Sequence, residues 1–196
     1  MSKRIITISR EFGSGGRYLG EEIAKRLGMD YYDKEILVKV AEKTGLSQKY
    51  IEQMGEGAPH KHQFSYSFVG RNSAGASMGD YMDTIQREVI LEAAEKSPCV
   101  IVGRCADYIL RERTDCLNIF VCGNEKEKTD RIMELYHLSE AEAKKQMKET
   151  DKKRRVHYEY YTEQRWGEAC NYSICLNSSD IGYEECINIV CKLAQN

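Results

Sequence analysis

The chain has 196 residues, of which 41% are hydrophobic and 31% are charged, and its formal net charge is −2. This length suits one α/β domain with a buried core, and the near-neutral charge gives no general preference for nucleic acid. The apolar run in MSKRIITI is too short for a signal peptide, and no stretch approaches the ~20 apolar residues of a membrane helix. We therefore expect a cytoplasmic protein with neither a membrane nor a nucleic acid as partner.

Apolar runs and helical segments alternate along the chain. Short apolar runs predict buried strands at 4–9, 29–32, 99–103, 116–122 and 172–177. Apolar residues at helical spacing predict helices at 16–28, 34–43, 80–96, 124–136, 139–165 and 182–194. Ser139 and Glu142 have the spacing of a capping box, which marks one helix start. The alternation predicts one domain over 1–196, with a parallel sheet covered by helices on both faces.

The segment 55–79 follows neither pattern. It is rich in glycine and serine, and it exceeds the length of about 12–15 residues above which structureless loops are uncommon. The HKH triplet at 60–62 has no nearby ligand set, and we interpret it as a solvated loop tip. Two structures fit this composition, a functional lid and a disordered loop.

Eight cysteines occur, and none forms a C-x-x-C pair. Several lie in apolar runs, such as Cys99 in CVIVG and Cys122 in LNIFVC. Free cysteine packs like a small hydrophobic residue, and cytosolic thiols stay reduced. We expect these cysteines to pack in the core in preference to forming a metal or redox site.

The stretch ITISREFGSGGRYLG, residues 5–19, predicts a strand, a glycine-rich turn and a helix. In a Walker A loop, G-x-x-x-x-G-K-[ST], backbone amides cradle the phosphates, the lysine reaches the β and γ groups, and the hydroxyl holds Mg²⁺. We aligned Gly15 with the second glycine of that pattern. Arg10, Gly16 and Arg17 then occupy the other three defining positions, and none of them matches.

The physical basis of phosphate binding is nevertheless present in this loop. Gly13, Gly15 and Gly16 can adopt positive φ and let a ligand approach the backbone. The helix that starts near Gly16 directs free amides and the positive end of its dipole toward the same point. Arg17, in the first helical turn, is unfavourable by roughly 0.3–1 kcal/mol unless an anion lies nearby.

We expect Glu11 to neutralise only one of the two arginines that flank the turn, so a polyanion would complete the arrangement. An arginine would then replace the Walker lysine, because its fork suits phosphate oxygens. The predicted phosphate-binding residues are Arg10, Gly13, Ser14, Gly15, Gly16 and Arg17. The alternative is an ordinary turn between strand and helix with exposed arginines. Mg²⁺ ligands are not assigned, since waters or a carboxylate such as Asp33 or Asp107 would have to replace the missing hydroxyl.

Two further basic features follow along the chain. The strand at 99–103 ends in Gly103-Arg104, before a helix that CADYIL begins. Because ligands bind outside the carboxyl ends of parallel strands, Arg104 would stand on the same rim as the glycine turn. The segment 144–165 holds eight lysines and arginines against four carboxylates, which gives it a net charge of +4 and leaves −6 for the rest. A solvated helix face and a lid that closes over phosphates both explain this charge.

In this order, the pieces resemble the cytidylate kinase-like family of nucleoside monophosphate kinases. The likeness rests on SREFGSGGR (9–17), YYDKEIL (31–37), VGR (102–104) and the basic segment. The resemblance implies a P-loop kinase fold with a central parallel sheet of about five strands. It also implies a mobile acceptor-binding insertion at about 34–96 and a helical lid at about 139–166. The implied reaction is transfer of the γ-phosphoryl group of ATP, with Mg²⁺, to a nucleoside monophosphate, for which CMP and dCMP are the first candidates.

The same resemblance implies roles for acceptor-binding residues. Arg104 would hold the acceptor phosphate, and Asp33 falls where the acceptor-binding region begins. The D-K-K-R at 151–154 matches a lid motif in which Asp151 would bind a ribose hydroxyl and Arg154 a phosphate. Cytidylate kinases proper follow the GR with an aspartate that helps to read cytosine.

In this chain that position is Cys105, and Asp107 is the candidate replacement. We assign catalysis to cations that surround the transferring group, namely Arg17, Lys153, Arg154 and Arg155. A non-catalytic nucleotide-binding regulator is the alternative, because it explains the missing lysine and hydroxyl directly. An RNA-binding module would use the basic segment and its tyrosines, but the charge balance and the lack of an RNA-binding motif disfavour it.

Overall fold

The computed structural model describes residues 3–47, 49, 51 and 78–196. The unpatterned segment predicted at 55–79, with its HKH triplet, lies outside the described residues except for 78 and 79. Those two residues begin a helix.

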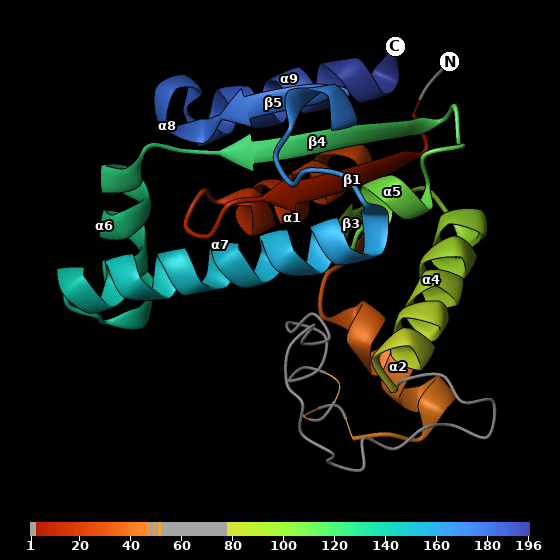
Figure 1. Cartoon of the computed structure of the whole chain (residues 1–196). Helices are drawn as coiled ribbons and strands as arrows, with labels where there is room; N and C mark the ends of the chain where they lie inside the picture. Colours follow the sequence, from red (N-terminus) through yellow and green to blue (C-terminus); the bar gives the residue numbers. More distant parts are fainter. Residues whose placement is uncertain (1–2, 48, 50, 52–77) are drawn as a thin grey trace, which may run out of the picture.

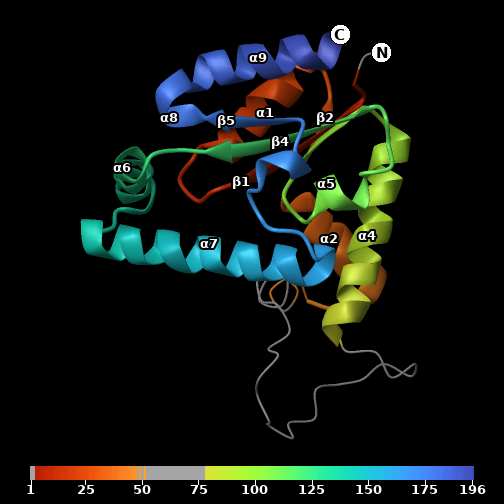
Figure 2. The same cartoon turned by 45° about the horizontal axis from the view of Figure 1, so that its top comes forward.

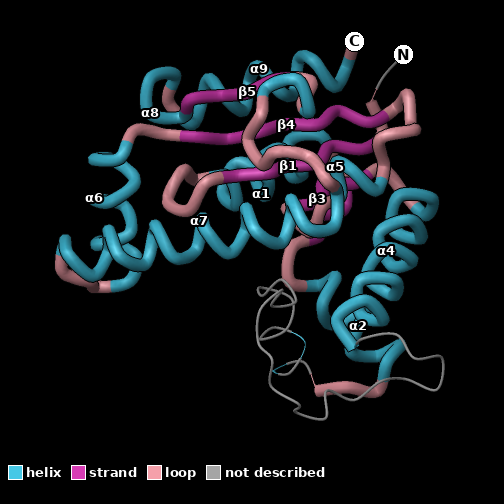
Figure 3. The backbone as a smooth tube through the Cα atoms, viewed as in Figure 1, coloured by secondary structure: helices cyan, strands magenta, loops and turns pink. Residues whose placement is uncertain are grey.

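Strands and helices alternate along the described chain (Figures 1 and 3). The strands are β1 (Ile5–Arg10), β2 (Asp30–Tyr32), β3 (Cys99–Val102), β4 (Cys116–Cys122) and β5 (Ile174–Asn177). The helices are α1 (Gly16–Leu27), α2 (Glu35–Thr44), α4 (Met78–Lys96), α5 (Ala106–Ile109), α6 (Glu125–Tyr136), α7 (Glu140–Thr162), η1 (Ala169–Asn171), α8 (Ser178–Ile181) and α9 (Tyr183–Gln195). The predicted strands and helices are confirmed. The pattern does not predict η1 and α8, because segments of three or four residues carry no periodicity.

The strands form one parallel sheet in the order β2-β3-β1-β4-β5. β1 lies at the centre, where Ile5 pairs with Cys99 of β3 and with Cys116 of β4. Since all strands run the same way, the ends of β1 and β3 meet at one edge. This register brings the residues that follow β3 beside Arg10, the last residue of β1.

Helices cover both faces of this sheet, because successive strand residues point to opposite sides. On one face, strand residues such as Ile5 and Ile101 pack with α2, α4 and α5. On the other face, residues such as Ile8 and Val100 pack with α1 and α9 (Figure 2). Cys99, Cys105, Cys116 and Cys186 are buried, as expected of packing residues, and Cys122 and Cys191 are partly buried. Cys170 and Cys175 are exposed, so the core packing predicted for all eight cysteines is wrong for these two.

α7 runs beside the sheet from α6 toward α4 and α5 (Figures 1 and 2). It begins with the predicted capping box, in which Ser139 and Glu142 bond each other's backbone. Its first half packs on α6 and on Phe12 of the glycine turn. No helix in the part of the chain that the structure describes is long and apolar enough to span a membrane.

Candidate functional site

The glycine turn between β1 and α1 needs its glycines for both backbone conformation and space. Gly13 and Gly15 have φ of 85° and 80°, a region that L side chains rarely adopt. A Cβ on Gly13 would lie 2.8 Å from the carbonyl oxygen of Lys128, and one on Gly15 would lie 2.5 Å from the ring of Tyr183. The turn is therefore a tightly packed element fitted between α6 and α9.

The start of α1 leaves backbone donors available at this turn. The first helical hydrogen bond joins the amide of Leu19 to the carbonyl of Gly15, at 2.9 Å. The amides of Gly16, Arg17 and Tyr18 precede that bond and have no acceptor within the helix. Such amides, together with the helix dipole, bind anions.

Three contacts from distant elements hold the backbone of the turn. Asp151 of α7 accepts a hydrogen bond from the amide of Phe12 at 2.7 Å. Arg154, one helical turn later, donates to the carbonyl of Arg10 at 3.0 Å. Ser178 of α8 donates to the carbonyl of Ser14 at 2.8 Å. The ligand roles predicted for Asp151 and Arg154 stay predictions, and in this structure both residues fix the loop.

Ion pairs around the turn differ from the expected arrangement. Glu11 pairs with Lys128 of α6 at 2.7 Å, so the expectation that it neutralises Arg10 or Arg17 is wrong. Arg17 instead pairs with Asp33 at 2.6 Å, and the Asp33 side chain is only 8% exposed. The reason is topological: the loop after β2 brings Asp33 beside α1, and α6 delivers a buried lysine to Glu11.

Arg10 passes between two glycines to reach the carboxyl edge of the sheet. A Cβ on Gly16 would lie 2.6 Å from Cβ of Arg10, and a Cβ on Gly103 would overlap the Arg10 guanidinium. Burial and the nearby charge of Arg154 lower the pKa of Arg10 to about 9. Folding therefore makes the charged form of Arg10 unfavourable, and a bound anion would stabilise that charge.

The backbone after β3 is strained. Gly103, Arg104 and Cys105 have φ of 75°, 59° and 53°, so three consecutive residues are left-handed. This conformation costs a non-glycine residue roughly 1–2 kcal/mol, and such strain clusters at functional sites. It places Arg104 and Cys105 on the wall of the same cavity that Arg10 enters.

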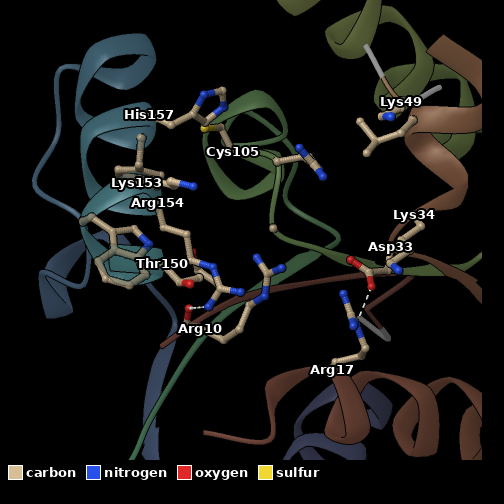
Figure 4. A pocket seen from close by; sticks show the side chains of 16 residues that line it. Arg10, Arg17, Asp33, Lys34, Lys49, Cys105, Thr150, Lys153, Arg154 and His157 are labelled. Carbon is tan, nitrogen blue, oxygen red and sulfur yellow. Dashed lines mark hydrogen bonds and ion pairs between the residues drawn. The ribbon is translucent and has the colours of Figure 1, made fainter. Parts of the chain in front are cut away.

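This cavity has a volume of about 660 Å³ and lies between the sheet edge, α2 and α7 (Figure 4). Among the described residues that line it, one is acidic, Asp33, and seven are basic: Arg10, Arg17, Lys34, Lys49, Arg104, Lys153 and Arg154. The remaining lining residues are Ser9, Leu37, Gly103, Cys105, Thr150, His157, Tyr158 and Trp166. A cavity with this excess of positive charge suits a polyanionic ligand.

Six predicted site residues meet in this cavity, and the others lie outside its lining. Arg10, Arg17, Asp33, Arg104, Lys153 and Arg154 line it, whereas Gly13, Ser14, Gly15, Gly16, Asp107, Asp151 and Arg155 do not.

Asp107 is buried behind Tyr158, whose hydroxyl donates to it at 2.7 Å, and burial raises the pKa of the Asp107 carboxyl. The guanidinium of Arg155 lies 6.0 Å from the centre of the Trp166 ring.

Sequence reasoning missed the uncharged residues that α7 contributes to the cavity. Thr150 and His157 lie three residues before and four residues after Lys153, so helical spacing puts them on the same face. That period is present in the sequence, but the surrounding run of charges masks it. Trp166, beyond the end of α7, gives no comparable signal.

A second, smaller space of about 20 Å³ adjoins the cavity between α2, α4 and α7, and both are lined by His157. Asp83 and Gln86 of α4 and Tyr161 of α7 also line it. Burial raises the pKa of Asp83 from 3.8 to about 6. No group of three or more His, Cys, Asp or Glu side chains that could hold a metal occurs within residues 3–47, 49, 51 and 78–196.

The raised pKa of Asp83 makes a prediction about stability. The folded protein binds this proton more tightly than the unfolded chain does, so stability falls as the pH rises from about 4 through 6. We expect Asp83→Asn to raise the free energy of unfolding by about 1 kcal/mol near neutral pH, after allowance for solvent screening, and by less near pH 4.5. Urea denaturation at both pH values measures this difference, and an equal gain at both would contradict it.

Comparisons with known proteins agree with this architecture. A family model described as the cytidylate kinase-like family matches residues 5–180. The chain belongs to this family. A search of curated proteins gave no match for this cytidylate kinase-like protein.

Solved structures similar to this cytidylate kinase-like protein share its fold. An uncharacterized protein from Eubacterium ventriosum is 28% identical, with a TM-score of 0.74 and 97% of both chains covered. Shikimate kinase from Bacteroides thetaiotaomicron is 15% identical, with a TM-score of 0.54 and coverage of 96% of this chain and 97% of that one. Shikimate kinase from Acinetobacter baumannii, solved with shikimate, is 13% identical, with a TM-score of 0.52 and coverage of 96% and 91%.

These neighbours identify the five-stranded α/β architecture as the P-loop kinase fold, as the resemblance implied. In a P-loop, the glycine-rich turn follows a strand and opens a helix, and the turn between β1 and α1 has this position. Family and fold together support a kinase-type phosphotransferase with a nucleotide kinase-like role.

Proposed function

We propose that this cytidylate kinase-like protein transfers the γ-phosphoryl group of ATP to a nucleoside monophosphate, with CMP and dCMP as the first candidates. One observation carries the proposal. The cavity at the carboxyl edge of the sheet gathers seven basic side chains against one carboxylate, and it adjoins the glycine turn and the start of α1. Phosphoryl transfer needs this kind of site, because its catalysis consists of positioning and of cations around the transferring group.

Arg10 is the best replacement for the missing Walker lysine. Arg17 is half exposed and paired with Asp33, so much of its charge is already compensated. Arg10 lies in the cavity, where burial, and then the positive charges of Arg154 and Arg104, disfavour its charged form. In the proposed reaction Arg10 contacts the donor phosphates, while the amides of Gly13–Gly16 and the first turn of α1 hold the β-phosphate.

The other cations divide between acceptor and lid. Arg104 stands at the end of β3, where it would fix the acceptor phosphate. Lys153 and Arg154 face the cavity from α7 and would stabilise the charge that spreads over the transferring oxygens. Arg155 is not assigned this role, since its side chain lies beside Trp166 and outside the cavity lining.

The residues present also fit Mg²⁺ in the manner usual for kinases. Mg²⁺ keeps several waters and is held by one or two carboxylates together with substrate phosphates. Asp33 is the carboxylate on the cavity wall and would be that ligand. When bound with the nucleotide, the ion would neutralise charge on the β and γ oxygens.

The proposal is tested by an acceptor screen. Purified protein with ATP, Mg²⁺ and each of CMP, dCMP, UMP, AMP and GMP is expected to form ADP with at least one acceptor, and CMP or dCMP should be the best. If no acceptor supports turnover, the enzyme proposal is wrong. Binding of ATP without turnover, seen as a rise in melting temperature, would then favour the non-catalytic regulator.

Two adjacent lysines of α7 provide a matched test of the lid. Both side chains are exposed, but Lys153 lines the cavity and Lys152 does not. We expect Lys153→Ala to lower kcat about tenfold to a hundredfold, the worth of one charge-assisted hydrogen bond. Lys152→Ala removes the same charge from the same helix and should change kcat less than twofold. Equal effects of the two substitutions in steady-state kinetics would remove Lys153 from the site.

A further inference from the structure

The cavity has two chemically different ends. Arg17 and Asp33 lie at one of them, close to the start of α1. His157 and Cys105 lie beside each other on the opposite side (Figure 4). Cys105 is buried, and burial raises the pKa of its thiol, so this residue offers neither charge nor a reactive thiolate. His157 and Cys105 thus form an uncharged patch on a wall that also carries Arg104 and Lys153, so this end suits an uncharged ligand group next to a phosphate.

His157 is the unusual residue at this end. Both of its ring nitrogens are buried, and neither has a hydrogen-bond partner among the described residues. A buried polar group left unpaired costs roughly 1–3 kcal/mol, so a residue kept in that condition calls for an explanation. A leucine or phenylalanine would fill the same space without this cost.

The imidazole is also uncharged. Burial, with the nearby charge of Arg104, lowers the pKa of His157 to about 4. At physiological pH the ring therefore offers one donor and one acceptor and no positive charge. This disfavours a role as a further phosphate-binding cation and matches a ligand group with donors and acceptors of its own.

The ring of His157 lies between an aromatic side chain and a small space. Tyr161, one turn further along α7, packs against it with ring centres 4.8 Å apart and an angle of 58° between the planes. On the other side lies the small space shared with Asp83 and Gln86. Its volume of about 20 Å³ has room for one water molecule. A water there would give one ring nitrogen a partner, and the His157 side chain also lines the main cavity.

We propose that His157 recognises the base of the acceptor nucleotide through a hydrogen bond from its neutral imidazole. This inference rests on the proposed function, because it assumes that the acceptor phosphate is held at Arg104. His157 lies near Arg104 on the cavity wall, so one ligand can reach both. In this proposal His157 recognises the base in place of Asp107, which bonds Tyr158 and does not line the cavity.

The test compares two ligands that differ only in the base. CMP and ribose 5-phosphate share the phosphate and the sugar, and calorimetry measures the affinity of each. His157→Phe keeps an aromatic ring against Tyr161 but removes both nitrogens. We expect this variant to bind CMP about tenfold more weakly, the upper worth of one neutral hydrogen bond, and ribose 5-phosphate within twofold of the wild type. His157→Gln, which restores a donor and an acceptor, should recover part of the CMP affinity.

The outcomes separate this inference from the proposed function. If the wild type binds none of CMP, dCMP, UMP, AMP and GMP, the proposed function fails. If it binds the best of these no more tightly than ribose 5-phosphate, or if His157→Phe weakens both ligands equally, the base-reading role is wrong while the kinase proposal stands. Arg104→Ala is the positive control and should weaken both ligands alike. Should His157→Phe fail to fold, His157→Leu carries the same expectation.

Discussion

Arg10→Met is expected to lower kcat/KM for phosphoryl transfer about a hundredfold, the upper part of the range for one charge-assisted hydrogen bond. Arg10→Lys should recover only part of this loss, because a lysine keeps the charge but lacks the guanidinium fork that binds two phosphate oxygens. Steady-state kinetics with saturating acceptor, and with ATP varied, measures both effects. Arg26→Met, which removes an arginine of α1 that pairs with Glu184 on the surface, is the control and should leave kcat/KM unchanged.

The same Arg10 variant carries an opposite expectation for stability. The pKa of Arg10 lies below its ordinary value of 12.5 in the folded chain, so folding disfavours the charged form. At neutral pH the charge therefore lowers stability, and its removal should leave the free energy of unfolding unchanged or raise it. A fall in activity together with a fall in stability would mean that Arg10 supports the fold. Activity within threefold of the wild type would remove it from the catalytic site.

Gly103→Ala is expected to lower kcat/KM at least tenfold, because its methyl group would overlap the Arg10 guanidinium and displace it. The substitution also places a side chain at φ 75°, which costs roughly 1–2 kcal/mol whatever the neighbours are. Activity and stability must therefore be separated by a control with the same backbone strain.

Gly28→Ala provides that control. Gly28, which caps the end of α1, has φ 64°, and a Cβ added there would meet no atom within 4 Å. Both variants should lose a similar amount of stability, about 2–4 °C in melting temperature per kcal/mol for a chain of this size, but only Gly103→Ala should lose activity. In the Arg10→Met background, Gly103→Ala should have little further effect on kcat/KM, since the group it displaces is already gone. Independent, additive losses would contradict this mechanism.

Local sequence patterns were sufficient to predict the order of strands and helices and the meeting of Arg10 with Arg104. Arg10 ends β1 and Arg104 comes two residues after the end of β3, and parallel strands end at one edge, so no tertiary detail was required. The ion-pair partners of the charged residues could not be predicted in this way. Glu11 pairs with a lysine more than a hundred positions away, and Arg17 pairs with Asp33 across the first crossover. Local sequence spacing does not indicate which of several distant residues a charged side chain will pair with.

The role of α7 was predictable only in part. Its basic composition was compatible with both a solvated face and a lid, and helical periodicity could have placed His157 on the face of Lys153. The ring nitrogens of His157 are buried and have no hydrogen-bond partner among the described residues, and this depends on three helices, α2, α4 and α7, that meet around the ring. The same holds for Gly103, whose need for glycine follows from the path of a side chain on another strand.

The central place of β1 in the sheet has a consequence for how the protein is made. β1 leaves the ribosome well before its two neighbours, β3 and β4, which begin at Cys99 and Cys116. Contacts so distant in sequence form slowly, so β1 and the glycine turn cannot complete their packing until β3 and β4 have been synthesised. The turn also takes a hydrogen bond from Ser178. A nascent chain that stops before that residue would lack this contact, so the glycine turn gains its full set of supports only after Ser178 has been synthesised.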